Sequence, residues 1–418
     1  MTTHIVSRRP RLNRRDLLRQ GFCGLGVSAS FPLVFRRAAQ AMTQEEKPGE
    51  FGNSNRILVV VELDGGNDGL NTVVPYGDDA YYRQRPKIAI PAEKVLPIDG
   101  HFGFHPSLAG FERLYKEGKF ALIHGCGYDN PILSHFAAMG FWHTGVPIAG
   151  EKLGWMGRLA DKLSPEVREN LIINIASRQS LAVRSRVHSP LVFDDPAQFL
   201  RIGRYEQIPI FETLIGAENS SQPGLNFLNG VAKNALKSAA FVREAWAGYS
   251  TPVNYGLDLP ISQDLRKVAA LISAGMPTQL YYVQYRNNDF DTHVHQVDLH
   301  ARILAYATDA IHGFVEDVNR IGRGDDVAMM VFTEFGRRVP ENASGGTDHG
   351  TATPVYVIGN KVKGGQYGDP VSLTNLDDGN LIYTTDYRRV YASMVGEWMG
   401  ADRSSVLKGD FEPLGLFG

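Results

Sequence analysis

Short runs of apolar, often β-branched residues recur along the chain and alternate with segments of helical periodicity. These runs occupy residues 57–63, 120–123, 171–175, 279–283, 327–332 and 354–358. Continuous apolar runs of this length are typical of strands that are buried on both faces. Because helical patterns lie between several of them, the chain predicts an α/β fold with a mostly parallel sheet covered on both faces.

Two helices are predicted most clearly. Over residues 296–321, apolar side chains fall on one stripe at helical spacing. A second helix is expected from about 387 to 399, with Asp386 as its N-cap and Gly400 as its stop. Residues 180–275 hold long polar stretches and a helical segment near 227–246, and they are predicted to be an insertion or a cap over one end of the sheet.

The N-terminus is typical of an export signal. Arg14 and Arg15 lie in the run NRRDLL, an apolar stretch follows at 21–35, and Ala39-Gln40-Ala41 offers a cleavage site. The paired arginines resemble the twin-arginine export motif. We therefore predict a signal peptide at 1–41, a flexible leader at 42–55 and a single domain at 56–418; a basic arm on a cytoplasmic protein is the alternative.

The composition of the chain argues against several classes of protein. With 43% hydrophobic residues, the 418-residue chain can bury a sizeable core. A net charge of −2 argues against broad nucleic-acid binding. Two cysteines cannot form a disulfide framework or a four-cysteine zinc site. No stretch after the signal is long and apolar enough for a membrane helix, so no integral membrane segment is expected.

Acidic residues follow the first predicted strand directly, where parallel sheets bind ligands. Residues 64–71 read DGGNDGLN. Asp64, at the strand exit, is well placed to bind a divalent cation, and Asn67 or Asp68 could bind a ligand oxygen. A hydrogen-bonded Asx/Gly turn would explain the same residues equally well.

A carboxylate and two imidazoles follow the strand predicted at 279–283. In an extended chain, Asp291, His293 and His295 would face one way; in a helix, Asp291 and His295 would share a face one turn apart. Either arrangement can offer a mixed ligand set to zinc, manganese or iron. The alternative is that the aspartate caps the helix and the histidines are solvated.

Polar residues also follow the strand predicted at 327–332. Glu334 closes that strand, and Asp348 and His349 lie in a glycine-rich turn before the next one. Glu334 is either a ligand or a structural acid. Arg337 could pair with Glu334 or bind an anionic group bidentately.

Ser134 lies beside His135 after the strand at 120–123. Adjacent side chains diverge, so a metal is a better activator of this hydroxyl than the neighbouring imidazole. The alternative is that Ser134 is only a helix N-cap.

Together these motifs, with the arginine motif and residues 385–400, resemble the DUF1501 family of secreted bacterial proteins. That family looks like a divergent branch of the alkaline phosphatase and sulfatase superfamily. The resemblance implies a three-layer α/β/α sandwich with a two-metal site at one end of the sheet. It implies metal-ligand positions at Asp64, Asp291, His293 or His295, Glu334 and His349, and a nucleophile at Ser134.

Two positions depart from the superfamily pattern. Phe335 stands where a ligand histidine is expected, a loss for which Asp348 could compensate. Cys126 is not followed by the Cys-x-Pro-x-Arg pattern that formylglycine formation needs, which disfavours a standard sulfatase mechanism.

These inferences favour an exported, periplasmic or secreted, metal-dependent hydrolase of phosphate or sulfate esters. One or two divalent cations (zinc, manganese or calcium) would activate Ser134 or a water, with Arg337 assisting. The substrate would be a small-molecule or glycan ester, and the twin-arginine translocase a partner during export. The alternatives are a non-catalytic metal-binding or scaffold protein of the cell envelope, and another metal-dependent enzyme such as a mutase or a carbohydrate-active esterase.

Overall fold

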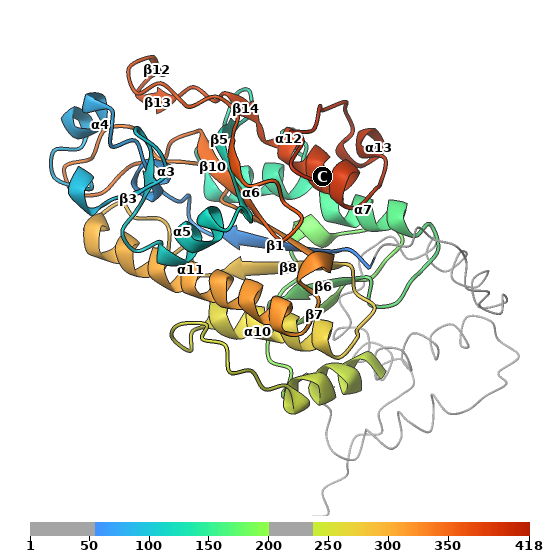
Figure 1. Ribbon diagram of the computed structural model, residues 1–418. Helices are drawn as coiled ribbons and strands as arrows, with labels where there is room; N and C mark the ends of the chain where they lie inside the picture. Colours follow the sequence, from blue (N-terminus) through green and yellow to red (C-terminus); the bar gives the residue numbers. More distant parts are fainter. Residues whose placement is uncertain (1–54, 200–236) are drawn as a thin grey trace, which may run out of the picture.

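The computed structural model describes residues 55–199 and 237–418 (Figure 1). The signal peptide predicted at 1–41 lies outside these residues, as does all but the last residue of the leader predicted at 42–55. Both segments therefore stay predictions.

A sheet of nine strands, counted over the described residues, forms the middle layer. Its order is β11-β5-β10-β9-β1-β8-β6-β7, and β14 also pairs with β5. The strands are β1 (Ile57–Leu63), β5 (Phe120–Gly127), β6 (Ile172–Ile175), β7 (Leu191–Phe193), β8 (Leu280–Tyr285), β9 (Val327–Phe332), β10 (Thr353–Ile358), β11 (Gly365–Tyr367) and β14 (Thr385–Asp386). Strand β10 pairs antiparallel with β5 and β9, and the other pairings are parallel. All six predicted apolar runs lie in this sheet, which confirms the predicted α/β fold.

Helices cover both faces of the sheet (Figure 1). One face carries α5 (Ala109–Lys116), α10 (Pro260–Ser273) and α11 (Gln296–Arg320), and the other carries α6 (His135–Thr144), α7 (Trp155–Leu163), α12 (Tyr387–Ala392) and α13 (Arg403–Leu407). Strand β1 contributes side chains to both hydrophobic cores, because its side chains alternate between the two faces of the sheet. Val59 and Val61 pack in the core beneath α10 and α11, and Leu58 and Val60 pack in the other.

Both predicted helices are present. Helix α11 matches the predicted 296–321 within one residue. Helix α12 begins after Asp386, whose side chain accepts a hydrogen bond from the Arg388 backbone N–H. It continues into η5 (Ser393–Trp398), a π-helical turn, and the chain leaves the helix before Gly400, which has φ +68°. A residue without a Cβ adopts this conformation readily.

The region predicted as an insertion or cap, 180–275, is described except for residues 200–236. In its described parts, β7 forms an edge of the sheet, α10 packs against α11 and β8, and residues 237–248 are helical. These parts are built into the sandwich. The remaining short elements are α3 (Gly69–Thr72), β2 (Val73–Val74), α4 (Asp79–Gln84), η1 (Ala92–Lys94), β3 (Leu96–Pro97), β4 (Gly103–Phe104), η2 (Leu181–Val183), η4 (Gly324–Asp326), β12 (Leu376–Asp377) and β13 (Asn380–Leu381).

The sheet topology brings the polar motifs to one edge. Strands β5, β9, β1 and β8 run in the same direction, so the loops that follow them leave at a common edge. Because β10 runs the opposite way, the chain enters it at that same edge. The loops around Asp64, His135, Asp291, Glu334 and His349 therefore meet there. None of the helices in the described residues is long and apolar enough to span a bilayer.

Candidate metal centre

Three side chains from different loops form a candidate metal centre at this edge. His135 begins α6 after β5, Asp291 follows β8, and His349 precedes β10. One potential ligand atom from each lies within 4.8 Å of the others. All three residues are half-buried, so the centre is reachable from solvent. A carboxylate with imidazoles is the mixed set that suits a divalent transition metal.

Asp291 is the middle of the cluster. Its Oδ1 lies 3.0 Å from His293 Nε2 and 3.2 Å from His349 Nε2, and the two Nε2 atoms are 2.9 Å apart. Its Oδ2 lies 3.4 Å from His135 Nε2. Ligands of one tetrahedral zinc ion, at the usual bond lengths, are about 3.3 Å apart. The distances of the three imidazoles from the Asp291 carboxylate are therefore close to those between ligands of one cation, and His135, Asp291 and His349 form a group that could hold it.

The other nitrogen of each histidine faces an oxygen. His135 Nδ1 lies 2.7 Å from Glu334 Oε1, His349 Nδ1 lies 2.9 Å from the Leu133 carbonyl, and His293 Nδ1 lies 3.3 Å from Asp348 Oδ1. An Nδ1–H that donates to an oxygen leaves Nε2 with its lone pair free, which is the usual arrangement of metal-binding histidines. All three Nε2 atoms face Asp291, so the three imidazoles are oriented as ligands.

Two buried polar atoms without hydrogen-bond partners also fit a cation site here. Asp64 Oδ1 and His135 Nε2 are buried and have no hydrogen-bond partner. Asp64 Oδ2 accepts a hydrogen bond from the Asn288 backbone N–H at 3.2 Å. Burial, together with the charges of Glu62 and Glu334, raises the pKa of Asp64 to about 7. A positive charge near these carboxylates would reduce their mutual repulsion.

Glu334 positions other groups. Its buried carboxylate accepts hydrogen bonds from the Gly65 backbone N–H at 3.1 Å and from Thr333 Oγ1 at 2.9 Å, besides contacting His135. Burial lowers the pKa of His135, but the hydrogen bond and charge of Glu334 outweigh it, so the pKa is raised. Glu334, predicted as either a ligand or a structural acid, thus contacts the candidate ligand His135.

Arg337, predicted to pair with Glu334 or to bind an anionic group bidentately, lies inside the protein and pairs with Asp291 instead. Its side chain is fully buried. Nε donates to the Gly66 carbonyl at 2.6 Å, Nη1 donates to the Thr347 carbonyl at 3.1 Å, and Nη2 donates to the Gly65 carbonyl and, at 2.6 Å, to Asp291 Oδ1. All three nitrogens donate hydrogen bonds in these contacts, so the guanidinium fastens the loops of the centre together.

The remaining predicted residues divide between the cluster and its surroundings. His293 joins the cluster, whereas His295 is exposed at φ +46° as the N-cap of α11. The predicted extended or helical geometry is interrupted by this turn. Asp348 is exposed and contacts His293 rather than the cluster's centre. Ser134 is the exposed N-cap of α6, but its hydroxyl makes no capping hydrogen bond, so capping does not explain it.

The two other polar residues of the first loop have structural roles. Asp68 is fully buried, pairs with Arg85 at 2.6 Å and caps α3. Asn67 Oδ1 accepts a hydrogen bond from His300 Nε2 at 2.8 Å. The prediction that one of them binds a ligand oxygen is therefore wrong, because both side chains are consumed by buried partners.

Sequence reasoning missed two features. His135 was considered only as a base for Ser134, although its spacing after a strand was a usable signal. A buried network beneath Asp64 was also missed: Glu62 contacts His143 Nε2 at 2.9 Å and accepts a hydrogen bond from the Tyr282 hydroxyl at 2.5 Å. The signal for this network was the glutamate inside the apolar run of β1.

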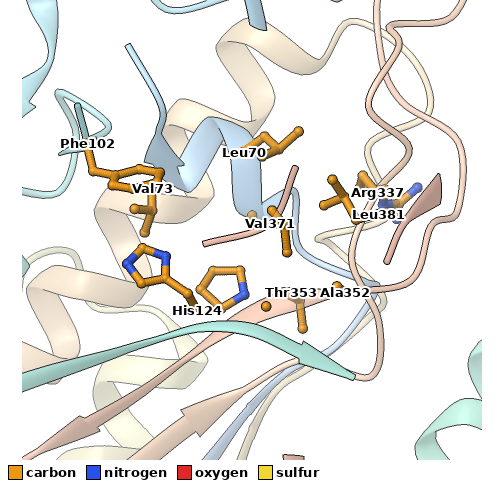
Figure 2. A pocket seen from close by; sticks show the side chains of 12 residues that line it. Leu70, Val73, Phe102, His124, Arg337, Ala352, Thr353, Val371 and Leu381 are labelled. Atoms are coloured by element: carbon orange, nitrogen blue, oxygen red, sulfur yellow. The ribbon is translucent and has the colours of Figure 1, made fainter. Parts of the chain in front are cut away.

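A small cavity lies on the other side of Arg337. Its volume is about 30 Å³, and Leu70, Val73, Phe102 and His124 are among its lining residues. Figure 2 shows His124 beside Val73, with Arg337 and Leu381 across the space. Such a volume holds about two waters. It is too small for an ester substrate, so the open cluster around Asp291 is the candidate functional site.

The fold and this cluster define an α/β sandwich with a candidate metal centre at one edge of its sheet. A family model described as "Protein of unknown function (DUF1501)" matches residues 271–408. That match includes Asp291, Glu334 and His349, and it confirms the resemblance over this part of the chain. No curated protein matches the sequence.

Several solved structures are distantly similar to the chain. The C-terminal periplasmic domain of EcEptC from Escherichia coli is 12% identical, with 86% of this chain and 88% of that chain covered and a TM-score of 0.36. A protein in the alkaline phosphatase superfamily from Vibrio parahaemolyticus is 10% identical, covering 81% and 70%, with a TM-score of 0.36. The PsFucS1 sulfatase from Pseudoalteromonas sp. is 12% identical, covering 83% and 70%, with a TM-score of 0.33.

Proposed function

We propose that the protein is a metal-dependent hydrolase of phosphate or sulfate esters. The observation that carries this proposal is the common orientation of His135, His293 and His349. Each has its Nδ1 against an oxygen and its Nε2 toward Asp291. The unpartnered Asp64 Oδ1 nearby supports the same proposal.

Asp291 and the three histidines would hold the cation. When bound, it would supply a Lewis acid that lowers the pKa of a nucleophile and stabilises charge on the transferring group. The chain itself offers Ser134, an exposed hydroxyl directly before His135, as a nucleophile. Glu334 keeps His135 oriented, and Arg337 keeps Asp291 in place. A water molecule is the alternative nucleophile.

The ligand set favours zinc or manganese among the cations considered. Calcium prefers sites made of oxygen ligands alone. Three imidazoles with one carboxylate match the preference of zinc, and manganese accepts such a mixture.

The test combines metal analysis with activity. Protein purified without added metal should contain zinc or manganese by elemental analysis, and chelation should abolish hydrolysis of a panel of phosphate and sulfate monoesters and diesters. Asp291→Asn should lose the metal and reduce turnover by about a hundredfold or more. Asp289→Asn, in the same loop, is the matched control and should keep both. A protein that folds without metal and binds none would refute the proposal.

A further variant identifies the nucleophile. Ser134→Ala should abolish turnover if the serine attacks the ester, and leave it within a few-fold if water attacks. Because the side chain is exposed and makes no capping hydrogen bond, loss of folding does not complicate this comparison.

One observation favours a second candidate, a non-catalytic metal-binding or scaffold protein. Phe335 occupies the place where the resemblance leads one to expect an imidazole, and its ring lies 4.8 Å from the rings of both His135 and His349. An apolar wall there reduces the room for a second cation. One bound metal per chain, with no turnover of any ester in the panel, would favour this candidate.

We further propose that the chain is exported by the twin-arginine translocase and works in the periplasm or outside the cell. The support is the arginine pair within NRRDLL, followed by an apolar stretch. Replacing Arg14 and Arg15 by lysine should retain the protein in the cytoplasm, whereas the same change at Arg8 and Arg9 should not. Export of both variants alike would contradict the proposal.

A further inference from the structure

Exposed apolar side chains gather beside the candidate metal centre. Nine large hydrophobic side chains are exposed in the described residues, and four of them belong to two short segments of the site. These four, called the apolar rim here, are Ile132, Leu133, Phe136 and Val294. Phe136 is 91% exposed, the largest fraction of the nine. Single exposed hydrophobic residues are ordinary, but a group around a polar cluster indicates a binding surface.

The rim residues lie next to the candidate ligands in the sequence or contact them through a hydrogen bond. The Leu133 carbonyl accepts the hydrogen bond that orients His349, at 2.9 Å. Phe136 directly follows His135 in the first turn of α6. Val294 directly follows His293 in the loop after β8. The rim therefore comes from two separate loops, and each of its segments adjoins a ligand of the same centre.

Arg337 does not offer a free positive charge to a molecule bound at the rim. That side chain is buried, and Gly65, Gly66 and Thr347 accept its hydrogen bonds. Phe136 and Val294, the two most exposed side chains of the rim, offer a charged or hydroxyl-rich glycan no hydrogen bond. A substrate with an apolar body would remove these side chains from water, which is favourable.

We propose that the preferred substrate is an ester of phosphate or sulfate whose alcohol part is a long alkyl chain. This inference rests on the proposed function, since the ester group must reach the cluster around Asp291. The alkyl part then lies on the apolar rim. Hydrolysis breaks the bond between phosphorus or sulfur and the alcohol oxygen, water supplies the new oxygen and a proton, and the apolar alcohol leaves.

The test compares esters that differ only in chain length. Decyl phosphate below its micelle concentration should be hydrolysed with a kcat/KM about tenfold or more above that of ethyl phosphate, with the corresponding sulfates tested in parallel. Phe136→Ser should raise KM for the decyl ester about fivefold to tenfold, the order expected when the contact of one phenyl ring is lost. The same variant should leave the ethyl ester unchanged. Ile148→Ser is the matched control, because Ile148 is 69% exposed beyond the other end of α6.

A binding measurement separates this inference from the proposed function. Decylphosphonate, which cannot be hydrolysed at its P–C bond, should bind the metal-loaded protein more tightly than methylphosphonate, and Phe136→Ser should remove the difference. If no ester is hydrolysed but this preference is present, the proposed activity fails and the rim still binds an alkyl chain. Equal kinetics and equal binding for long and short chains would overturn the inference.

Two other occupants of the rim would also overturn it. If Phe136→Ser dissociates a dimer without changing the chain-length preference, the rim is an interface between two copies. If the variant instead loses binding to vesicles of phosphatidylglycerol, again with no change for monomeric esters, the rim contacts a membrane surface. Size-exclusion chromatography and vesicle sedimentation decide between these outcomes.

Discussion

Replacing Arg337 by lysine tests whether this residue fastens the site or binds substrate. Lysine keeps the positive charge beside Asp291, but it has three N–H donors at one point, whereas the guanidinium spreads its donors over a planar fork. The contacts to the Gly66 and Thr347 carbonyls, at 2.6 and 3.1 Å, come from two different nitrogens. One ammonium group cannot reach both while it also contacts Asp291.

The size of the effect follows from those two carbonyls. Each buried acceptor left without a partner costs about 1–3 kcal/mol. At least one of the two loses its partner, so Arg337→Lys should lower the free energy of unfolding by about 1–3 kcal/mol or more, a large part of the stability of a typical domain. Affinity for zinc should also fall, because the loops that carry Asp291 and the glycines after β1 lose their common anchor.

Chemical denaturation followed by tryptophan fluorescence measures the change, since Trp142, Trp155 and Trp398 are buried. Arg338→Lys is the matched control. Its guanidinium is 36% exposed and lies 3.4 Å from the exposed Asp378, a pair worth less than about 1 kcal/mol. If Arg337→Lys unfolds like the wild type while KM for esters rises, Arg337 binds substrate and the structural assignment is wrong.

Three further outcomes are expected. His135→Ala should weaken zinc binding about a hundredfold or more in chelator competition, while His295→Ala should not; equal losses would exclude His135 as a ligand. Burial lowers the pKa of His300 to about 3, so between about pH 3 and 6.5 the unfolded chain binds a proton that the folded one does not. The free energy of unfolding should therefore fall as the pH falls through this window. His300→Gln should make this dependence on pH weaker. An unchanged dependence in the variant would show that His300 is not its cause. Gly66→Ala should lower the melting temperature more than Gly345→Ala, because both have φ +70° but only at Gly66 would the new Cβ meet a buried aromatic ring, at 2.3 Å. Equal falls in melting temperature for the two variants would show that the loop at Gly66 moves to accommodate the new Cβ.

The sheet could be predicted because its strands are buried on both faces. Runs such as 57–63 and 327–332 have no polar face, so continuous apolar residues identify them. The direction of β10 could not be predicted, since an apolar run is the same in either direction. Strands of two or three residues, such as β7 and β14, carry too few positions for a pattern.

The site could be predicted only in part, because ligand roles depend on distant partners. Asp291, His293 and His349 were found from their position beside strands. The candidate-ligand role of His135 depends on residues far away in the sequence, among them Glu334, 199 residues away, which contacts its Nδ1. The structural role of Arg337 could not be predicted for the same reason, because the carbonyls that accept its hydrogen bonds come mainly from loops far away in the sequence.

The reversed direction of β10 has a consequence for how such a centre can vary. The stretch from Glu334 to Thr351 leaves the sheet and returns to it at one edge, and it is closed by the hydrogen bonds of the Gly336 N–H to the Thr351 carbonyl and the Gly350 N–H to the Gly336 carbonyl, both 2.8 Å. It carries Arg337, Asp348 and His349, and Arg337 also fastens it to the glycines after β1 and to Asp291. An exchange of this segment would therefore change both the side chains offered to a cation and the anchor of the neighbouring loops, so metal preference and local stability would change together.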